Sequence, residues 1–317
     1  MIEVDYRAKT LFGTTGVTPE MTQYYESVMN AWVEALRPYL NLERLGSFVV
    51  TDNFIEDVLE FQVQQHYLCP RVTNNEMGRA LGKTMLNKET GLYTIFLDEQ
   101  LGGMLLDEEM FDKVTSKFEK DYRSEMSVRR KLAINVLAHE LSHVEFETVA
   151  DEPSFPATYY GEAIHLAWLI ADEYYAVRNA AMLEPISAAG SYVVALTDTE
   201  ACILRRRREY NLREVGIDDF GKDFFEFARL ALIYGVSAIA DAYDTGVGLQ
   251  AFSNCRFSAV AEELSKVLSE TYSEVKSGKG LISCEQIAES VISFHRQFEV
   301  FASDNPAGLY LDIPVRL

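Results

Sequence analysis

Two histidines and a glutamate stand close together in the middle of the chain, in the run His139-Glu140-Leu141-Ser142-His143. On an α-helix, residues four apart differ by about 40° around the axis and by about 6 Å along it. Both imidazoles therefore leave one face of the helix and can bind the same tetrahedral metal ion. Glu140 lies about 100° from His139, where its carboxylate can take a proton from a water and pass it to a leaving group.

This run matches the pattern HExxH, which is typical of zinc peptidases. The alternative is an ordinary amphipathic helix with two polar residues on one side. The chain has only 5 histidines, which makes a chance match uncommon. Apolar residues also recur at helical spacing, with Ile134, Leu137, Leu141 and Val144 in one stripe and Leu132 and Val136 in line with the histidines. We expect a helix from about Met126 to about Glu147 that is buried on the side of the motif.

A catalytic zinc needs a third protein ligand and an open position for water. No third histidine follows His143 at the distance that metzincins use, so we expect a carboxylate from the helix predicted between Thr158 and Met182. Glu162 follows His143 after 18 intervening residues and Glu173 after 29. The two glutamates share one helix face about 16 Å apart, so only one can reach the metal, and spacing alone does not choose between them.

The stretch from Trp168 to Ala180 resembles the ExxA helix of ImmA/IrrE-like metallopeptidases, through Glu173-Tyr174-Tyr175-Ala176 and the following Leu183-Glu184-Pro185. The resemblance implies that Glu173 is the third zinc ligand and that Ala176 lets the two metal helices approach closely. The Asp that often follows this alanine is replaced by Val177, which leaves the partner of one histidine unassigned. The resemblance covers about residues 45–185, and its sharp matches are the two metal motifs.

Tyrosines near the proposed zinc could stabilise the oxyanion that forms when water attacks a carbonyl. Tyr174 and Tyr175 are the candidates that adjoin Glu173, although packing is the ordinary role of such residues. By position Tyr159, Tyr160 and Tyr192 are eligible as well, and the sequence does not rank them. We expect His165 to be structural.

Strand-like runs precede the motif, at 46–51, 81–86 and 92–97, and the last two are joined by a polar linker ending in Gly91, which predicts a β-hairpin. Together with the resemblance, they predict an α+β, zincin-like domain over residues 1–185, with a small twisted sheet over the HExxH helix. In such domains an edge strand pairs with substrate, and we expect the run 92–97 to bind an extended peptide in this way.

The remainder, residues 186–317, predicts an all-helical domain with helices near 186–210, 220–243, 258–276 and 284–301. Turns are expected at Asp244-Thr245-Gly246-Val247-Gly248 and at Ser277-Gly278-Lys279-Gly280. Neither glycine pair has the context of a phosphate-binding loop, so we expect no nucleotide site.

The charge balance is strongly acidic, with 29 Lys and Arg against 49 Asp and Glu and a net charge of −20. This disfavours nucleic acid as a partner and favours basic ones. Arg205-Arg206-Arg207-Arg208 is the one basic cluster, and we expect it to be solvated or salt-bridged. Without a secretory signal, a long apolar run or paired cysteines, the sequence predicts a cytoplasmic protein with reduced thiols and no membrane contact.

The resulting hypothesis is a zinc-dependent endopeptidase acting on a protein or peptide, with a regulatory protein as one possible substrate. His139, His143 and Glu173 would hold Zn²⁺, and Glu140 would be the general base. Two alternatives remain open: an aminopeptidase-like enzyme that uses Glu162, and a protein without catalysis that binds zinc or regulates. The sequence does not indicate the oligomeric state.

Overall fold

The computed structural model describes residues 2–11, 14–68, 70–72, 74–75, 78–243, 249–280, 282–306 and 308–315. The chain forms two compact units. Unit 1 comprises Met1–Thr148 and Asn179–Ile186, and unit 2 comprises Val149–Arg178 and Ser187–Leu317. The predicted domains, 1–185 and 186–317, stay a prediction, because a compact unit is a group of residues in contact and need not fold alone.

Unit 1 is built on a four-stranded mixed sheet with the order β1-β4-β8-β7. Its strands are β1 (Glu3–Tyr6), β4 (Leu45–Thr51), β7 (Gly82–Asn87) and β8 (Leu92–Asp98). β4 is parallel to both β1 and β8, and β7 is antiparallel to β8. The predicted strand and hairpin are therefore confirmed. The hairpin turn uses Gly91 at a positive φ of 72°, which glycine adopts without strain.

The prediction that residues 92–97 form an edge strand is wrong. β8 has β4 on one side and β7 on the other, so its backbone is already paired along both edges. An apolar run on both faces is typical of such an interior strand, and every residue from Tyr93 to Asp98 is buried. Within the described sheet, β7 takes the terminal position next to β8.

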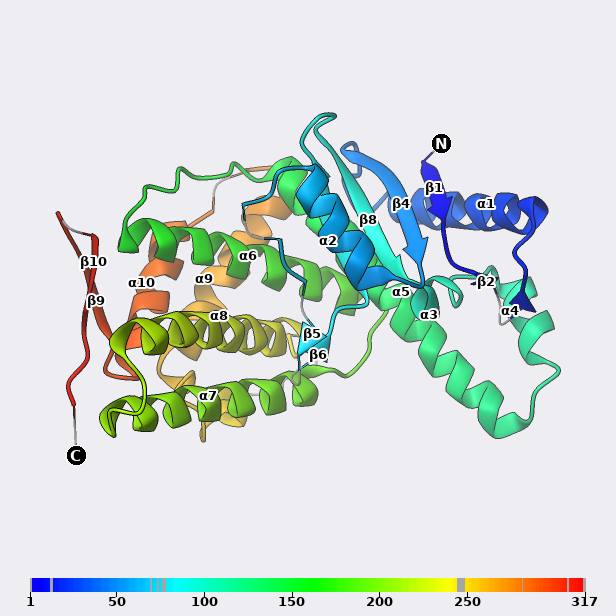
Figure 1. Cartoon of the computed structure of the whole chain (residues 1–317). Helices are drawn as coiled ribbons and strands as arrows, with labels where there is room; N and C mark the ends of the chain where they lie inside the picture. The colour runs from blue at the N-terminus through cyan, green and yellow to red at the C-terminus, as the bar shows by residue number, and fades with distance from the viewer. Residues whose placement is uncertain are drawn as a thin grey trace. The chain divides into compact units, whose positions relative to one another are not determined.

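Helices cover both faces of this sheet. Phe48, Val50, Ile95 and Leu97 point to one side, where they pack with residues of α1 (Pro19–Leu36) and α5 (Lys120–Val149). The alternate residues Val49 and Phe96 point to the other side and pack with α2 (Phe54–Gln64). Figure 1 shows α2 running along β8. The long helix α5 extends the predicted 126–147 helix by about two turns, mainly at its start.

The remaining elements of unit 1 are short. Two of them are helices, α3 (Glu99–Gly102) and α4 (Glu108–Thr115). The others form two small two-stranded sheets: β2 (Thr10–Leu11) pairs with β3 (Thr14–Thr15), and β5 (Asn74–Asn75) pairs with β6 (Gly78–Arg79). Asp107 caps α4 by accepting a hydrogen bond from the backbone of Met110 at 2.7 Å.

Unit 2 is mainly helical. It contains α6 (Tyr159–Leu183) as far as Arg178, then α7 (Ala189–Asn211), α8 (Ile217–Asp241), the short 3-10 helix η1 (Leu249–Phe252), α9 (Ser258–Lys276) and α10 (Cys284–Arg296). The four predicted helices are confirmed to within a few residues, except that α10 ends at Arg296. The turn predicted at 277–280 is present, with Gly278 at a positive φ of 73°. The turn predicted at 244–248 lies outside the described residues.

The prediction that the last part of the chain is all-helical is wrong. Two antiparallel strands, β9 (Phe301–Asn305) and β10 (Gly308–Asp312), form a hairpin close to the C-terminus. The apolar residues of the two strands are consecutive, Phe301 and Ala302 in β9 and Leu309 to Leu311 in β10, and do not alternate with polar ones as in a half-buried strand. Most residues of the pair are exposed, including Phe301, Leu309 and Tyr310, so no buried face imposes an alternating pattern on the sequence.

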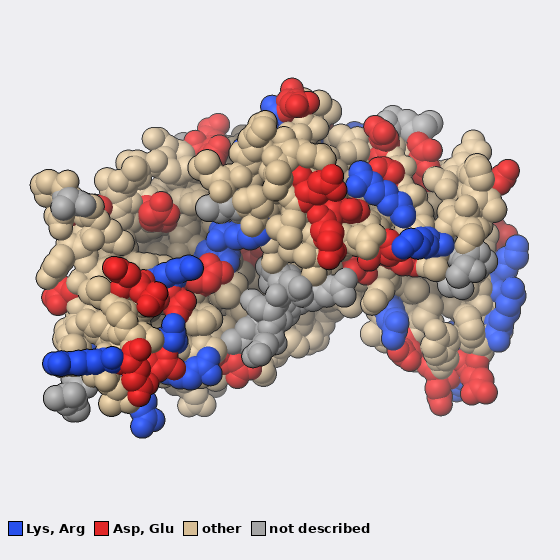
Figure 2. Space-filling model, viewed as in Figure 1, with Lys and Arg blue, Asp and Glu red and all other residues tan. Residues whose placement is uncertain are grey.

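The basic cluster on α7 is salt-bridged, as expected. Arg206 pairs with Asp223 and with Glu209, and Arg207 lies 3.5 Å from Glu299. Figure 2 shows basic and acidic side chains interleaved on the face viewed. Cys202, Cys255 and Cys284 are free thiols, and Cys69 lies outside the described residues. No described helix combines the length and the apolar character that crossing a bilayer requires.

Candidate metal centre

The two motif histidines converge as the helical spacing predicts. Nε2 of His139 and Nε2 of His143 are 3.0 Å apart, and their rings stand at 90° with centroids 4.6 Å apart. Two ligands of a tetrahedral zinc at about 2.0–2.1 Å would be separated by about 3.4 Å. The pair is therefore close to the separation that one zinc ion requires. Leu137, Leu141 and Val144 hold this part of α5 in the core of unit 1, as the apolar stripe predicts.

Glu173 is the acidic residue that joins the pair. One ligand atom each of His139, His143 and Glu173 lie within 4.8 Å of one another, and all three residues are half-buried. Glu162 is exposed in the first turn of α6 and is not part of this group. Two imidazoles and one carboxylate are a donor set of catalytic zinc sites that leave one position for water. The residues present thus fit a zinc ion.

Ser237 and two tyrosines of unit 2 interact with Glu173. Oγ of Ser237, on α8, donates to Oε1 of Glu173 at 3.4 Å. The pKa of Tyr192 is raised by burial first and then by the negative charge of Glu173. The pKa of Tyr234 is also raised, again by burial first, with a further contribution from Glu173. Sequence reasoning named Tyr192 without ranking it and missed Ser237 and Tyr234, which lie on another helix and carry no motif.

Glu140 is buried against strand β7. Its side chain is 5% exposed, and Oγ1 of Thr84 lies 2.8 Å from its Oε2 and 2.9 Å from its backbone oxygen. Gly82 leaves the room that this carboxylate fills, because a Cβ at Gly82 would lie 2.8 Å from both Cγ and Oε1 of Glu140. The glutamate expected to be the general base is thus held against β7, the terminal strand of the sheet as far as the described residues show.

Tyr174 and Tyr175 are buried in the packing of unit 2. The hydroxyl of Tyr174 accepts a hydrogen bond from Nη1 of Arg178 at 3.3 Å, and burial raises its pKa. Tyr175 packs on Tyr272 with ring centroids 5.2 Å apart. Their expected role in stabilising an oxyanion stays a prediction, and Tyr192 and Tyr234 have the clearer connection to Glu173.

The other histidines in unit 2 have structural surroundings. His165 packs on Phe155, with ring centroids 4.9 Å apart. His295 is 3% exposed, and its Nδ1 is 2.9 Å from the hydroxyl of Tyr159. Burial lowers the pKa of His295 to about 3, so its imidazole is neutral at physiological pH.

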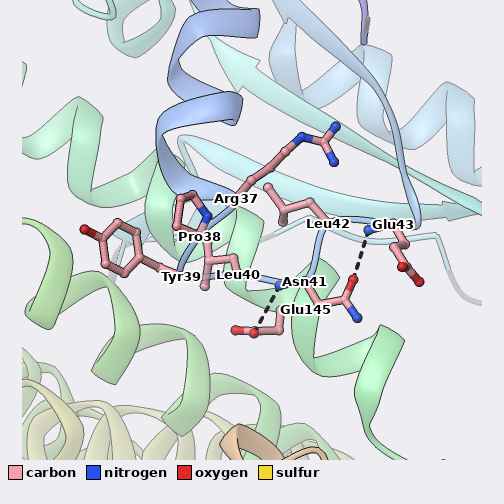
Figure 3. Close-up of a pocket in the computed structure, with 8 residues that line it drawn as sticks. All are labelled: Arg37, Pro38, Tyr39, Leu40, Asn41, Leu42, Glu43 and Glu145. Carbon is pink, nitrogen blue, oxygen red and sulfur yellow. Dashed lines mark hydrogen bonds between the residues drawn. The ribbon is translucent and has the colours of Figure 1, made fainter.

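Glu145, on α5, accepts hydrogen bonds from two other segments of unit 1. Its Oε1 accepts from the backbone N–H of Asn41 at 3.1 Å, and its Oε2 accepts from Nδ2 of Asn179 at 3.4 Å. Figure 3 shows the first of these bonds at the wall of a pocket of about 430 Å³ formed with residues 37–43. The pocket contains none of the predicted site residues.

No family model, curated protein or solved structure matches this chain. The resemblance to ImmA/IrrE-like metallopeptidases therefore depends on the two motifs alone, and membership of that family stays a prediction.

Proposed function

We propose that this chain is a zinc-dependent endopeptidase. The observation that carries the proposal is the group of His139, His143 and Glu173, whose ligand atoms lie within 4.8 Å of one another next to the buried Glu140. Sequence spacing alone left Glu162 and Glu173 as alternatives, and only Glu173 belongs to this group.

The residues have separate roles in this proposal. The two histidines and Glu173 hold the ion, which when bound lowers the pKa of a water and polarises the scissile carbonyl. Glu140 accepts the proton of the attacking water and returns it to the leaving amine. Thr84 keeps the carboxylate of Glu140 in place through its hydroxyl, 2.8 Å away.

Strand β7 is the proposed docking site for a peptide, in place of β8. The backbone N–H of Asp98 donates to the carbonyl of Leu81, and bonded pairs alternate along an antiparallel ladder. The backbone groups of Gly82 and Thr84 are therefore directed to the open edge. A peptide paired with them as an additional strand would pass beside Glu140, with backbone hydrogen bonds giving affinity for many sequences.

Metal content and hydrolysis test the proposal together. The parent protein is expected to hold about one zinc per chain and to cleave fluorescence-quenched peptide libraries, including pools rich in Lys and Arg that suit its acidic surface. Glu140→Gln should keep the zinc and lose about 10²–10⁴-fold in kcat/KM. Glu162→Gln, the same change at an exposed glutamate, should retain activity. Equal cleavage by Glu140→Gln and the parent would contradict the mechanism.

The third ligand has its own test. Glu173→Ala should empty the site in elemental analysis, whereas Glu162→Ala should keep its zinc. The opposite result would favour the aminopeptidase-like alternative. A parent protein without zinc, and without a rise in Tm when zinc is added, would favour a protein without metal catalysis.

A further inference from the structure

Ser237 is a polar residue in an apolar part of helix α8. Its side chain is 1% exposed, and its neighbours Val236, Ala238 and Ile239 are buried apolar residues of unit 2. A buried hydroxyl without a hydrogen-bond partner costs free energy, so such a residue requires a partner inside the unit.

The hydroxyl of Ser237 donates to another helix. Buried Ser and Thr residues in helices commonly donate to the carbonyl four residues earlier. Thr199 does so to Ala195 at 2.7 Å, and Ser290 does so to Gln286 at 3.4 Å. Ser237 instead donates to Oε1 of Glu173 on α6 at 3.4 Å. The sequence offers no reason for this choice, since the two residues are 64 positions apart.

We propose that Ser237 is a positioning residue that holds Oε1 of Glu173 and so directs the other oxygen, Oε2, to the metal. This inference rests on the proposed function, because it assigns Glu173 as a zinc ligand. A carboxylate can rotate about its terminal bond, and a fixed donor on one oxygen reduces the number of orientations that compete with metal binding. Hydrogen bonds of this kind orient metal ligands in other sites, and their loss typically weakens metal affinity about 10–100-fold.

The test measures zinc affinity by competition with a chromophoric chelator. Ser237→Ala removes one oxygen and keeps the helix, and we expect its zinc Kd to rise about 10–100-fold. Ser290→Ala is the matched control, because Ser290 belongs to the same unit, is also 1% exposed and bonds at the same 3.4 Å to its own helix. Its zinc Kd should equal that of the parent. Circular dichroism establishes that both variants are folded.

A second comparison separates positioning from a general loss of structure. In a Glu173→Ala background there is no carboxylate to orient, so adding Ser237→Ala should change the remaining zinc affinity less than about twofold. A large further loss would mean that Ser237 acts through the packing of unit 2. Visible absorption of bound Co²⁺ should change between the parent and Ser237→Ala, since it reports ligand geometry, and should not change in Ser290→Ala.

The two proposals fail in different ways. A parent protein that binds no zinc refutes the proposed function and the role of Ser237 with it. A parent that binds zinc, together with a Ser237→Ala variant of equal affinity and equal Co²⁺ spectrum, refutes the role of Ser237 alone.

Discussion

Replacement of Gly82 by alanine adds one methyl group directly against the proposed general base. A Cβ at Gly82 would lie 2.8 Å from Cγ and Oε1 of Glu140 and 3.0 Å from Cγ1 of Val136. Ordinary contact begins near 3.4 Å, so full relief of this contact separates the new methyl and the glutamate by a further 3.4 − 2.8 = 0.6 Å. Movement away from Gly82 also strains the 2.8 Å hydrogen bond between Thr84 and Oε2.

The shift predicts a loss of rate with retained metal. A displacement of 1 Å at a reacting group can cost about 100-fold, so a displacement of about 0.6 Å should lower kcat/KM about 10- to 100-fold. Overpacking should destabilise unit 1 by about 1–3 kcal/mol. Zinc content should equal that of the parent, because neither histidine is among the atoms that the new methyl meets.

The assay is kcat/KM on a quenched peptide that the parent cleaves, with zinc content and Tm measured on the same samples. Gly46→Ala is the control, because its Cβ would lie 3.0 Å from Cβ of Leu92 in the same sheet and does not meet Glu140. It should lose stability but keep its activity at temperatures where it is folded. A Gly82→Ala protein that holds zinc and cleaves within twofold of the parent would refute the claim that this contact fixes the base.

Two further predictions concern stability. Burial lowers the pKa of His295 to about 3, against 6.5 for the free side chain, so below pH 6.5 the unfolded chain binds a proton that the folded chain does not. The free energy of unfolding should therefore fall by about 1.4 kcal/mol per pH unit from about pH 6 towards pH 3 through this residue. In urea titrations His295→Phe should reduce this slope. Asn179→Leu removes a donor from the buried carboxylate of Glu145 and should cost about 1–3 kcal/mol. Tyr25→Phe deletes a buried bond to a neutral carbonyl and should cost less, about 1 kcal/mol; equal costs would show that the charge of Glu145 adds nothing.

Local patterns were sufficient for most of the secondary structure. The spacing of apolar residues predicted α5, and helical composition without strand-like clusters predicted the four helices from α7 to α10. Short runs of strand composition on either side of a polar linker ending in Gly91 predicted the β7–β8 hairpin. These patterns depend on residues a few positions apart, which the helix and strand geometries relate directly. The hairpin β9–β10 was not predicted, because its strands are mostly exposed and their apolar and polar residues hardly alternate.

The sequence by itself was sufficient to predict that His139 and His143 lie on one helix face. A spacing of four on one helix places both imidazoles on the same face, and in the structure their Nε2 atoms are 3.0 Å apart. The sequence could not choose between Glu162 and Glu173 by spacing, because both share one face of α6. The resemblance favoured Glu173, and the group of ligand atoms within 4.8 Å of one another contains Glu173 and not Glu162. The role of Glu173 as a zinc ligand stays a proposal.

The tertiary structure alone decided the surroundings of the site. It placed β8 inside the sheet and β7 at its end, set Thr84 and Gly82 against Glu140, and brought Ser237 to Glu173. Each of these contacts joins residues that are more than 50 positions apart or depends on the order of strands. Such contacts depend on how whole helices and strands pack against one another. The short-range spacing of apolar residues in the sequence does not predict them.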